Sequence, residues 1–224
     1  MAGMKGFYFG LAAIAVIGSG VLWVTNRRAA AVVPVGPIPM DAIASGRGFP
    51  GYVAGSDDAP VTIIEYADFQ CPGCQVAWLL TVQDLKERLV EQGTVKFIFR
   101  DFPLEIHDKA RQAHHAAACA NEQGMFWQMH DALFAKQNQW SPSASVAERI
   151  FRGYAEEVGV DLEQYDACMA EGRYRGRIQA TYEDGIRLGI SSTPTMIIGD
   201  QMFGGLTYDQ LKRVVDSLVT ETTQ

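Results

Sequence analysis

The sequence predicts an α/β protein in which a four-stranded mixed sheet carries an inserted helical subdomain and follows an N-terminal transmembrane helix. Three observations lead to this expectation. An uncharged apolar run lies near the amino terminus, a strand–helix–strand pattern follows it, and a strand–strand–helix pattern lies near the carboxyl terminus. The stretch between the two patterns, at residues 105–190, has almost wholly helical character and forms the expected insertion.

The amino-terminal segment, residues 1–28, is expected to attach the chain to a membrane. Residues 7–24 are uncharged, and this run is near the minimum of about 18 residues for a helix that crosses the hydrocarbon. One lysine precedes the run and two arginines follow it, so charge leaves the orientation open. A cleaved secretory signal usually has a shorter apolar core of about 7–15 residues. An uncleaved signal-anchor is therefore favoured, and a signal peptide cleaved among the small residues 29–31 is the alternative.

A linker follows at residues 29–50. It contains four prolines and scattered glycines, which is typical of an extended, semi-rigid spacer. The folded domain is expected to cover residues 51–220, including the helical insertion.

The domain begins with a strand–helix–strand unit. Residues 61–66 (VTIIEY) are apolar and β-branched, which is typical of a buried strand. Residues 71–91 place apolar side chains on one helical face, and Gly93 suits the end of that helix. Residues 95–100 (VKFIFR) alternate and predict a second strand. A connecting helix makes the two strands parallel neighbours.

The remaining elements follow from helical periodicity and turn residues. A tight turn at Gly199–Asp200 separates two short strands at residues 196–198 and 201–203, and an amphipathic helix over 207–219 closes the domain. The expected helices of the insertion lie at residues 110–123, 125–137, 146–158, 162–171 and 175–188.

The amino-acid composition argues against two classes of protein, nucleic-acid-binding proteins and small disulfide scaffolds. The net charge is −7, which argues against a nucleic-acid partner, because such a partner selects a basic surface. Hydrophobic residues make up 48% of the chain, enough for a core without metal or disulfide staples. The four cysteines therefore do not indicate a small disulfide scaffold.

Two of these cysteines form the motif Cys71-Pro72-Gly73-Cys74 at the start of the predicted helix. A Cys-x-x-C motif in a strand–helix–strand pattern indicates a redox site. Backbone N–H groups at a helix start stabilise a thiolate, and cysteines in such positions have pKa values of about 3.5–7.5. Pro72 suits the first helical turn, and Gly73 leaves the dithiol face open.

Two alternatives to a redox site are an inert disulfide and half of a zinc site. The sequence contains no second Cys-x-x-C pair, which disfavours zinc. We expect thiol–disulfide exchange through a mixed disulfide, in which a substrate thiolate attacks Cys71 and Cys74 leaves.

A second motif, Ser192-Thr193-Pro194-Thr195, directly precedes the third predicted strand. A proline is tolerated at the first residue of a strand. Most X–Pro bonds are trans, so this motif alone predicts an ordinary loop. Together with the upstream Cys-x-x-C, it indicates a cis-proline loop beside the dithiol, where backbone groups can pair with a substrate chain.

Four blocks of this sequence resemble the DsbA-like group of thioredoxin-fold proteins. They lie in the order Asp58–Cys74, Phe99–Leu104, Phe126–Phe134 and Gly189–Thr195, and the resemblance covers roughly residues 50–220. It implies a thioredoxin-like fold with an inserted helical subdomain. It also implies dithiol oxidase activity outside the cytoplasm, with re-oxidation by a quinone-linked membrane partner.

The resemblance also assigns roles by motif position. Cys71 matches the nucleophile, Cys74 the resolving cysteine and Thr193–Pro194 the cis-proline loop. Glu65 matches the buried acid under the dithiol, where a carboxylate can carry the Cys74 proton; a salt-bridged strand residue is the alternative. Gly73 departs from the histidine that strong oxidases of the group often carry, which leaves the oxidising strength open.

Cys119 and Cys168 lie on predicted helices of the insertion. Buried free thiols are one interpretation, because cysteine packs as a small hydrophobe. A structural disulfide is favoured in an oxidising compartment, and some members of the group carry one here. A metal site is disfavoured, and we expect neither a metal nor a cofactor. The histidines considered as ligands near Cys119 are His107, His114, His115 and His130.

The leading hypothesis is an oxidase that introduces disulfides into exported or unfolded proteins with cysteines. The signal-anchor predicts a single-pass attachment to the cell membrane; cleavage would make the protein secreted. The catalytic domain is expected outside the cytoplasm on chemical grounds, because disulfides form and persist there. The first alternative is a disulfide reductase or isomerase that uses the same site. The second is a non-catalytic module that binds peptides.

Overall fold

The computed structural model describes residues 32, 34–37, 49–142 and 147–222. The chain divides into two compact units, Met1–Val33 and Pro34–Gln224. The transmembrane helix predicted at residues 7–24 lies outside the described residues. Among the helices that are described, none combines the length and the apolar character needed to cross a membrane.

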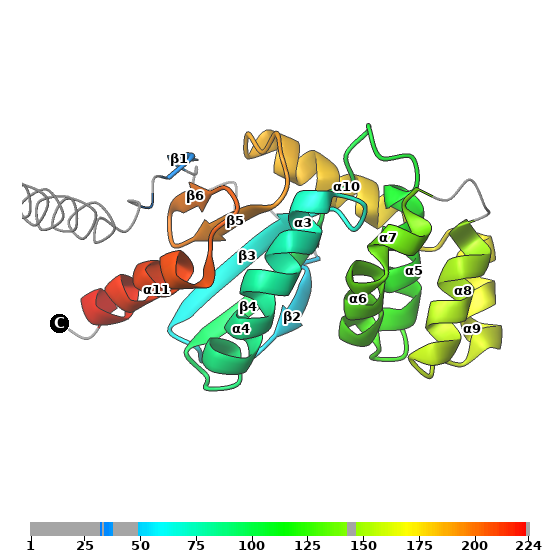
Figure 1. Cartoon of the computed structure of the whole chain (residues 1–224), viewed down its shortest axis with the longest axis horizontal. Helices are drawn as coiled ribbons and strands as arrows, with labels where there is room; N and C mark the ends of the chain where they lie inside the picture. Colours follow the sequence, from blue (N-terminus) through cyan, green and yellow to red (C-terminus); the bar gives the residue numbers. More distant parts are fainter. Residues whose placement is uncertain (1–31, 33, 38–48, 143–146, 223–224) are drawn as a thin grey trace, which may run out of the picture. The chain divides into compact units, whose positions relative to one another are not determined.

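The second unit is built around a mixed sheet with the strand order β1-β6-β5-β3-β4-β2 (Figure 1). The central strand β3 (Val61–Ala67) pairs in parallel with β4 (Val95–Asp101), as the strand–helix–strand pattern predicts. On its other side β3 pairs antiparallel with β5 (Thr195–Ile198), which pairs antiparallel with β6 (Gln201–Phe203). The four predicted strands are all present.

The prediction of four strands was wrong in number, because a short strand is added at each edge. β2 (Tyr52–Ala54) pairs with β4, and β1 (Gly36–Pro37) pairs with β6. Strands of two or three residues are too short to show alternation. At Gly51 a Cβ atom would lie 2.6 Å from the Phe99 carbonyl oxygen and φ is 114°, so only glycine admits this approach of β2 to β4.

The helix after β3 is continuous but not uniformly α-helical. It runs through α3 (Pro72–Ala77), the π-helical segment η1 (Trp78–Val82), α4 (Gln83–Leu85) and a second π-helical segment, η2 (Lys86–Val90). The last turn closes with a bond from the Glu91 N–H to the Lys86 carbonyl, five residues earlier. Of the apolar residues that predicted this helix, Val82, Leu85 and Leu89 are buried, whereas Leu79 is 59% exposed.

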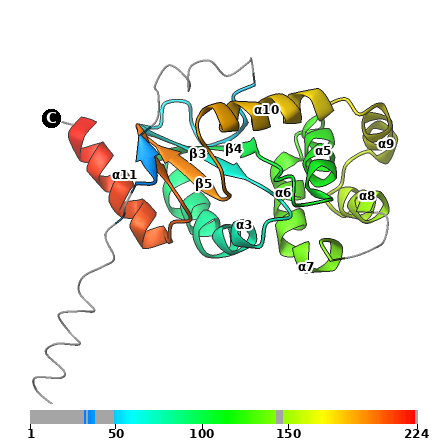
Figure 2. The ribbon, with the colours of Figure 1, turned by 90° about the horizontal axis from the view of Figure 1, so that it is seen from above.

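The described residues between β4 and β5 contain six helices, which form the insertion. Figures 1 and 2 show the helices labelled α5 to α9 gathered beside the sheet, while α10 and α3 cover opposite faces of the sheet. The closing helix α11 (Tyr208–Thr222) lies near β3 and η1. The insertion helices are α5 (Ala110–Asn121), α6 (Phe126–Ala135), α7 (Gln137–Trp140), α8 (Ala147–Glu157), α9 (Leu162–Glu171) and α10 (Arg175–Arg187).

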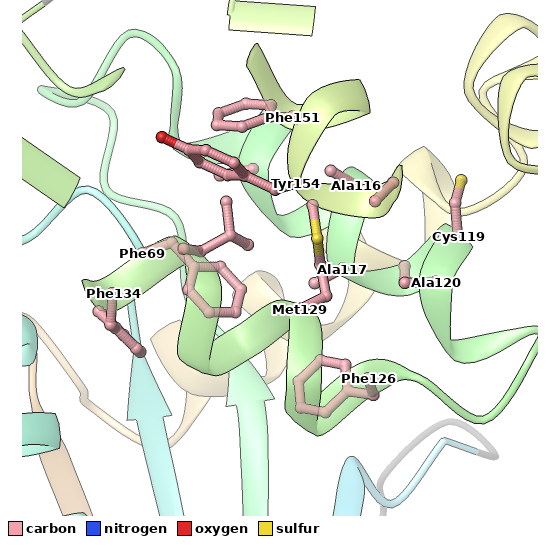
Figure 3. Packing of buried hydrophobic residues seen from close by; sticks show 14 of the residues in the cluster. Phe69, Ala116, Ala117, Cys119, Ala120, Phe126, Met129, Phe134, Phe151 and Tyr154 are labelled. Carbon is pink, nitrogen blue, oxygen red and sulfur yellow. The ribbon is translucent and has the colours of Figure 1, made fainter. Parts of the chain in front are cut away.

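One hydrophobic core joins the insertion to the sheet. Phe69, which follows β3, packs on Phe134 of α6 with ring centroids 5.0 Å apart (Figure 3). Cys71 and Cys74 belong to the same buried cluster as the alanine-rich face of α5. The insertion therefore packs directly against the segment that carries the dithiol.

A disulfide joins Cys119 of α5 to Cys168 of α9, with Cα atoms 5.8 Å apart. This is the pairing that the resemblance implied. It links two helices of the insertion whose cysteines are 49 residues apart in the sequence.

Candidate active site

The Cys-x-x-C motif lies at the turn from β3 into α3. Cys71 is the N-cap residue of α3, with extended φ and ψ of −73° and 122°, and Pro72 occupies the first helical position. The Cys71 N–H donates to the Asp68 carbonyl at 3.1 Å, which fixes the turn. Cys71 and Cys74 are present as free thiols, and α3 presents the Cys71 side chain to the free N–H groups of its first turn.

The environment of Cys71 stabilises its thiolate. A hydrogen bond from the Cys74 thiol is the largest cause that lowers the pKa of Cys71, to about 5, and the Cys74 and Gly73 backbone N–H groups add to it. Partial burial opposes this change. Cys71 therefore carries a negative charge at neutral pH, which suits a nucleophile and a leaving group.

Cys74 has the opposite character. Its side chain is 1% exposed, and burial raises the pKa of this thiol well above the ordinary value. The neighbouring Cys71 and Glu65 raise it further. The Asp68 N–H donates to the Cys74 Sγ at 3.4 Å and acts in the other direction. The Cys71 thiol is therefore a much stronger acid than the Cys74 thiol, which lies one helical turn away.

Glu65 lies in the middle of the sheet, on β3, opposite Phe99 of β4 and Met196 of β5. It is 2% exposed, and burial raises the pKa of its carboxyl group to about 8. The group therefore retains its proton at neutral pH. Glu65 also acts electrostatically on Cys74, where it helps to raise the pKa of the thiol.

The Thr193–Pro194 loop is far from the Cys-x-x-C motif in the sequence but lies beside the dithiol in the structure. The peptide bond between these residues is cis. The Cys71 Sγ lies 3.5 Å from the Thr193 carbonyl oxygen. A Cβ atom at Gly73 would lie 3.5 Å from Pro194 Cδ, which is ordinary van der Waals contact. The structure thus brings Cys71, Cys74, Glu65 and this loop into one site.

A family model described as thioredoxin matches residues 50–217. The chain belongs to the thioredoxin family. A 155-residue stretch is 36% identical to the Na(+)/H(+) antiporter NhaA 3 of Salinispora tropica, covering 69% of this chain and 22% of that protein. The chain is also 24% identical to the probable disulfide bond formation protein D of Bacillus anthracis, covering 72% of this chain and 75% of that one.

Solved structures agree with this membership of the thioredoxin family. Oxidised BdbD from Bacillus subtilis matches with a TM-score of 0.69 at 22% identity, covering 85% of this chain and 99% of that one. Structures named DsbA share the fold as well. These structures share the thioredoxin-like fold with the inserted helical subdomain that the resemblance implied. The chain spans less than a third of the length of the antiporters that head the curated relatives.

Within this thioredoxin-family domain, hydrogen bonds connect the insertion to the turn and helix that carry the dithiol. The Gln137 Nε2 donates to the Phe69 carbonyl at 2.7 Å and to the Cys71 carbonyl at 3.0 Å. The Gln75 Nε2 donates to the Phe134 carbonyl at 2.9 Å. Gln137 is buried, so these bonds are shielded from water. They tie the turn to α6 and α7.

Asp68 and Gln137 also belong to the site, although no sequence motif predicted either residue. Asp68 directly follows β3, at the carboxyl end of a parallel strand, and this position was the available signal. No sequence signal indicated Gln137, because it lies 66 residues from its hydrogen-bond partner Cys71.

Two of the histidines considered as metal ligands lie against carboxylates instead. The Nδ1 atoms of His114 and His130 lie 2.6 and 2.8 Å from the carboxylates of Asp101 and Asp131. His115 lies near Cys119 and Cys168, with candidate ligand atoms within 4.8 Å of one another. Both of those sulfurs are joined in the disulfide, so neither is available there as a thiolate ligand.

Proposed function

We propose that the chain is a thiol–disulfide oxidoreductase that works as a dithiol oxidase and introduces disulfides into exported proteins. The observation that carries this proposal is the contrast between the two cysteines. The pKa of Cys71 is lowered to about 5 at a helix start, while burial raises the pKa of Cys74. A stabilised Cys71 thiolate favours the reduced form of the protein, and this preference drives oxidation of a substrate.

The first step breaks the Cys71–Cys74 disulfide. A substrate thiolate attacks the Cys71 Sγ, a mixed disulfide forms, and Cys74 leaves with the electron pair. Glu65 is protonated at neutral pH because its pKa is about 8, so its carboxyl group supplies the proton that Cys74 takes up.

The second step releases the oxidised substrate. A second substrate thiolate attacks the substrate sulfur of the mixed disulfide, and Cys71 leaves as a thiolate. The substrate dithiol has then lost two electrons and become a disulfide, and the protein has gained them as a dithiol. The Thr193 carbonyl lies 3.5 Å from the Cys71 Sγ, and this proximity supports a role for the loop in pairing with the backbone of a bound substrate.

The location of the protein and the identity of its redox partner are part of the same proposal. The apolar run at residues 7–24 anchors the domain outside the cytoplasm, where disulfides persist. A quinone-linked membrane partner re-oxidises the dithiol. Both points rest on the amino-terminal sequence and on the DsbA-like resemblance.

The reduction potential tests the direction of the reaction. The protein is equilibrated with mixtures of reduced and oxidised glutathione, and the dithiol is trapped by alkylation and quantified by mass. An oxidase is expected well above the value of about −270 mV typical of thioredoxin. A potential near that value would reject the oxidase and favour the reductase or isomerase.

Transfer to a substrate is measured in parallel. The oxidised protein is mixed with a reduced, unfolded protein that contains two cysteines, and Cys71→Ser serves as the inactive control. No transfer by the wild type, with the unfolded protein bound equally by wild type and Cys71→Ser, would instead indicate a peptide-binding module.

A further inference from the structure

Asp68 is the residue whose backbone touches both cysteines. Its N–H donates to the Cys74 Sγ at 3.4 Å, and its carbonyl oxygen accepts the Cys71 N–H at 3.1 Å. Cys74 is buried, so its sulfur is removed from water when it becomes an anion. The Asp68 N–H is therefore a donor aimed at an atom on which negative charge develops during exchange.

The Asp68 side chain is 0% exposed and is held by three groups. Its Oδ1 accepts the Gln70 N–H at 2.7 Å, and its Oδ2 accepts the Leu104 N–H at 2.8 Å. The His107 Nδ1 lies 2.6 Å from the same Oδ2. A carboxylate only accepts, so the imidazole donates from Nδ1. Three hydrogen-bond donors thus surround the buried Asp68 carboxylate.

His107 connects this carboxylate to a second loop. It lies between β4 and α5, and its N–H donates to the Leu104 carbonyl at 3.0 Å. Its side chain is 16% exposed. The loop around His107 and the dithiol turn are therefore joined through Asp68, whose side-chain bonds determine where its backbone N–H points.

We propose that Asp68 and His107 form a positioning pair that holds the Asp68 N–H against the Cys74 sulfur as that sulfur leaves or attacks. This inference rests on the proposed exchange reaction. The bond to sulfur strengthens only while Cys74 carries charge, because hydrogen bonds to ionised groups are stronger than neutral ones. In the disulfide and in the neutral thiol the sulfur is uncharged. The pair therefore lowers the barrier without shifting the equilibrium.

The test uses two substitutions at His107, which is partly exposed. Asn can place its side-chain N–H near the position of Nδ1, whereas Ala provides no donor. Oxidised protein is mixed with excess dithiothreitol in a stopped-flow instrument, and the rate is compared with the equilibrium constant against glutathione. His107→Ala is expected to slow exchange about tenfold, in both directions, with the equilibrium constant unchanged. His107→Asn is expected to retain most of the rate.

The matched control is the Asp101–His114 pair at the end of β4. Its Nδ1–Oδ1 distance is also 2.6 Å, both side chains are 0% exposed, and neither makes a hydrogen bond to Cys71 or Cys74 in the described part of the chain. His114→Asn is expected to leave the exchange rate of the folded protein within about twofold of wild type.

A second variant acts on the carboxylate itself. Asp68→Asn turns one acceptor into a donor that faces the Leu104 or Gln70 N–H, so exchange is expected to slow at least as much as in His107→Ala. Circular dichroism confirms that each variant is folded.

Three results would overturn the positioning role: an unchanged rate in His107→Ala, an equal slowing in His114→Asn, or a shifted equilibrium constant that accounts for the slowing. An inactive wild-type protein would instead overturn the proposed function, and with it this inference.

Discussion

Replacing Glu65 by Gln is expected to change how stability depends on pH. Gln has nearly the shape of the protonated acid but cannot ionise. Burial raises the pKa of Glu65 from 4.5 to about 8, so the folded protein holds a proton that the unfolded chain releases between these values. Stability of the wild type therefore falls as pH rises from 4.5 to 8, because the unfolded state binds fewer protons.

The size of this effect follows from the pKa change. A difference of about 3.5 pKa units at 1.36 kcal/mol each corresponds to roughly 5 kcal/mol. At pH 4.5 the free energies of unfolding of wild type and Glu65→Gln should be close. At pH 8 the variant should be more stable by up to roughly 5 kcal/mol.

Urea unfolding of the oxidised protein measures this difference, because the disulfide form removes thiol titration from the comparison. Glu156→Gln, at an exposed position on α8, is the control, and its difference from wild type should stay flat over the same range. A difference between wild type and Glu65→Gln that did not grow from pH 4.5 to pH 8 would refute the buried, protonated state of Glu65.

Three further predictions concern the cysteines and their neighbours. Cys74→Ala should raise the pKa of Cys71, since the Cys74 thiol is the largest cause that lowers it; thiolate absorbance at 240 nm measures the change, and an unchanged pKa would contradict the assignment. Gly73→His should raise the reduction potential against glutathione, because a Cβ fits there and a nearby imidazolium stabilises the Cys71 thiolate; a lowered potential would be inconsistent with this. Replacing Cys119 and Cys168 together by Ala should reduce the free energy of unfolding by up to about 4 kcal/mol in urea titrations, because the disulfide closes a long loop; an equally stable variant would refute its structural role.

Local sequence patterns were sufficient to predict the strands that position the site and one helix of the insertion. The β-branched run at residues 61–66 and the alternating run at 95–100 predicted two parallel strands, which the structure contains as β3 and β4. The helix at residues 162–171 has the predicted bounds, because the Asp161 side chain caps its start and Gly172 ends it in the left-handed region.

Other features depend on contacts that no local pattern encodes. The single helix expected at residues 125–137 ends at Ala135, and α7 then places Gln137 under the Cys71 turn. The Asp68–His107 contact joins residues 39 apart, and its existence depends on how the loop after β4 folds back. Periodicity describes one element at a time, so pairs of this kind become visible only in three dimensions.

Thiolate titration of the reduced protein tests the central claim most directly. Absorbance at 240 nm is followed from pH 3 to pH 10, and alkylation with mass analysis assigns each thiol. The contrast between the cysteines predicts that Cys71 ionises near pH 5, and that Cys74 stays protonated beyond the ordinary value for a free thiol. Two thiols that both titrated near about 8.5 would contradict it.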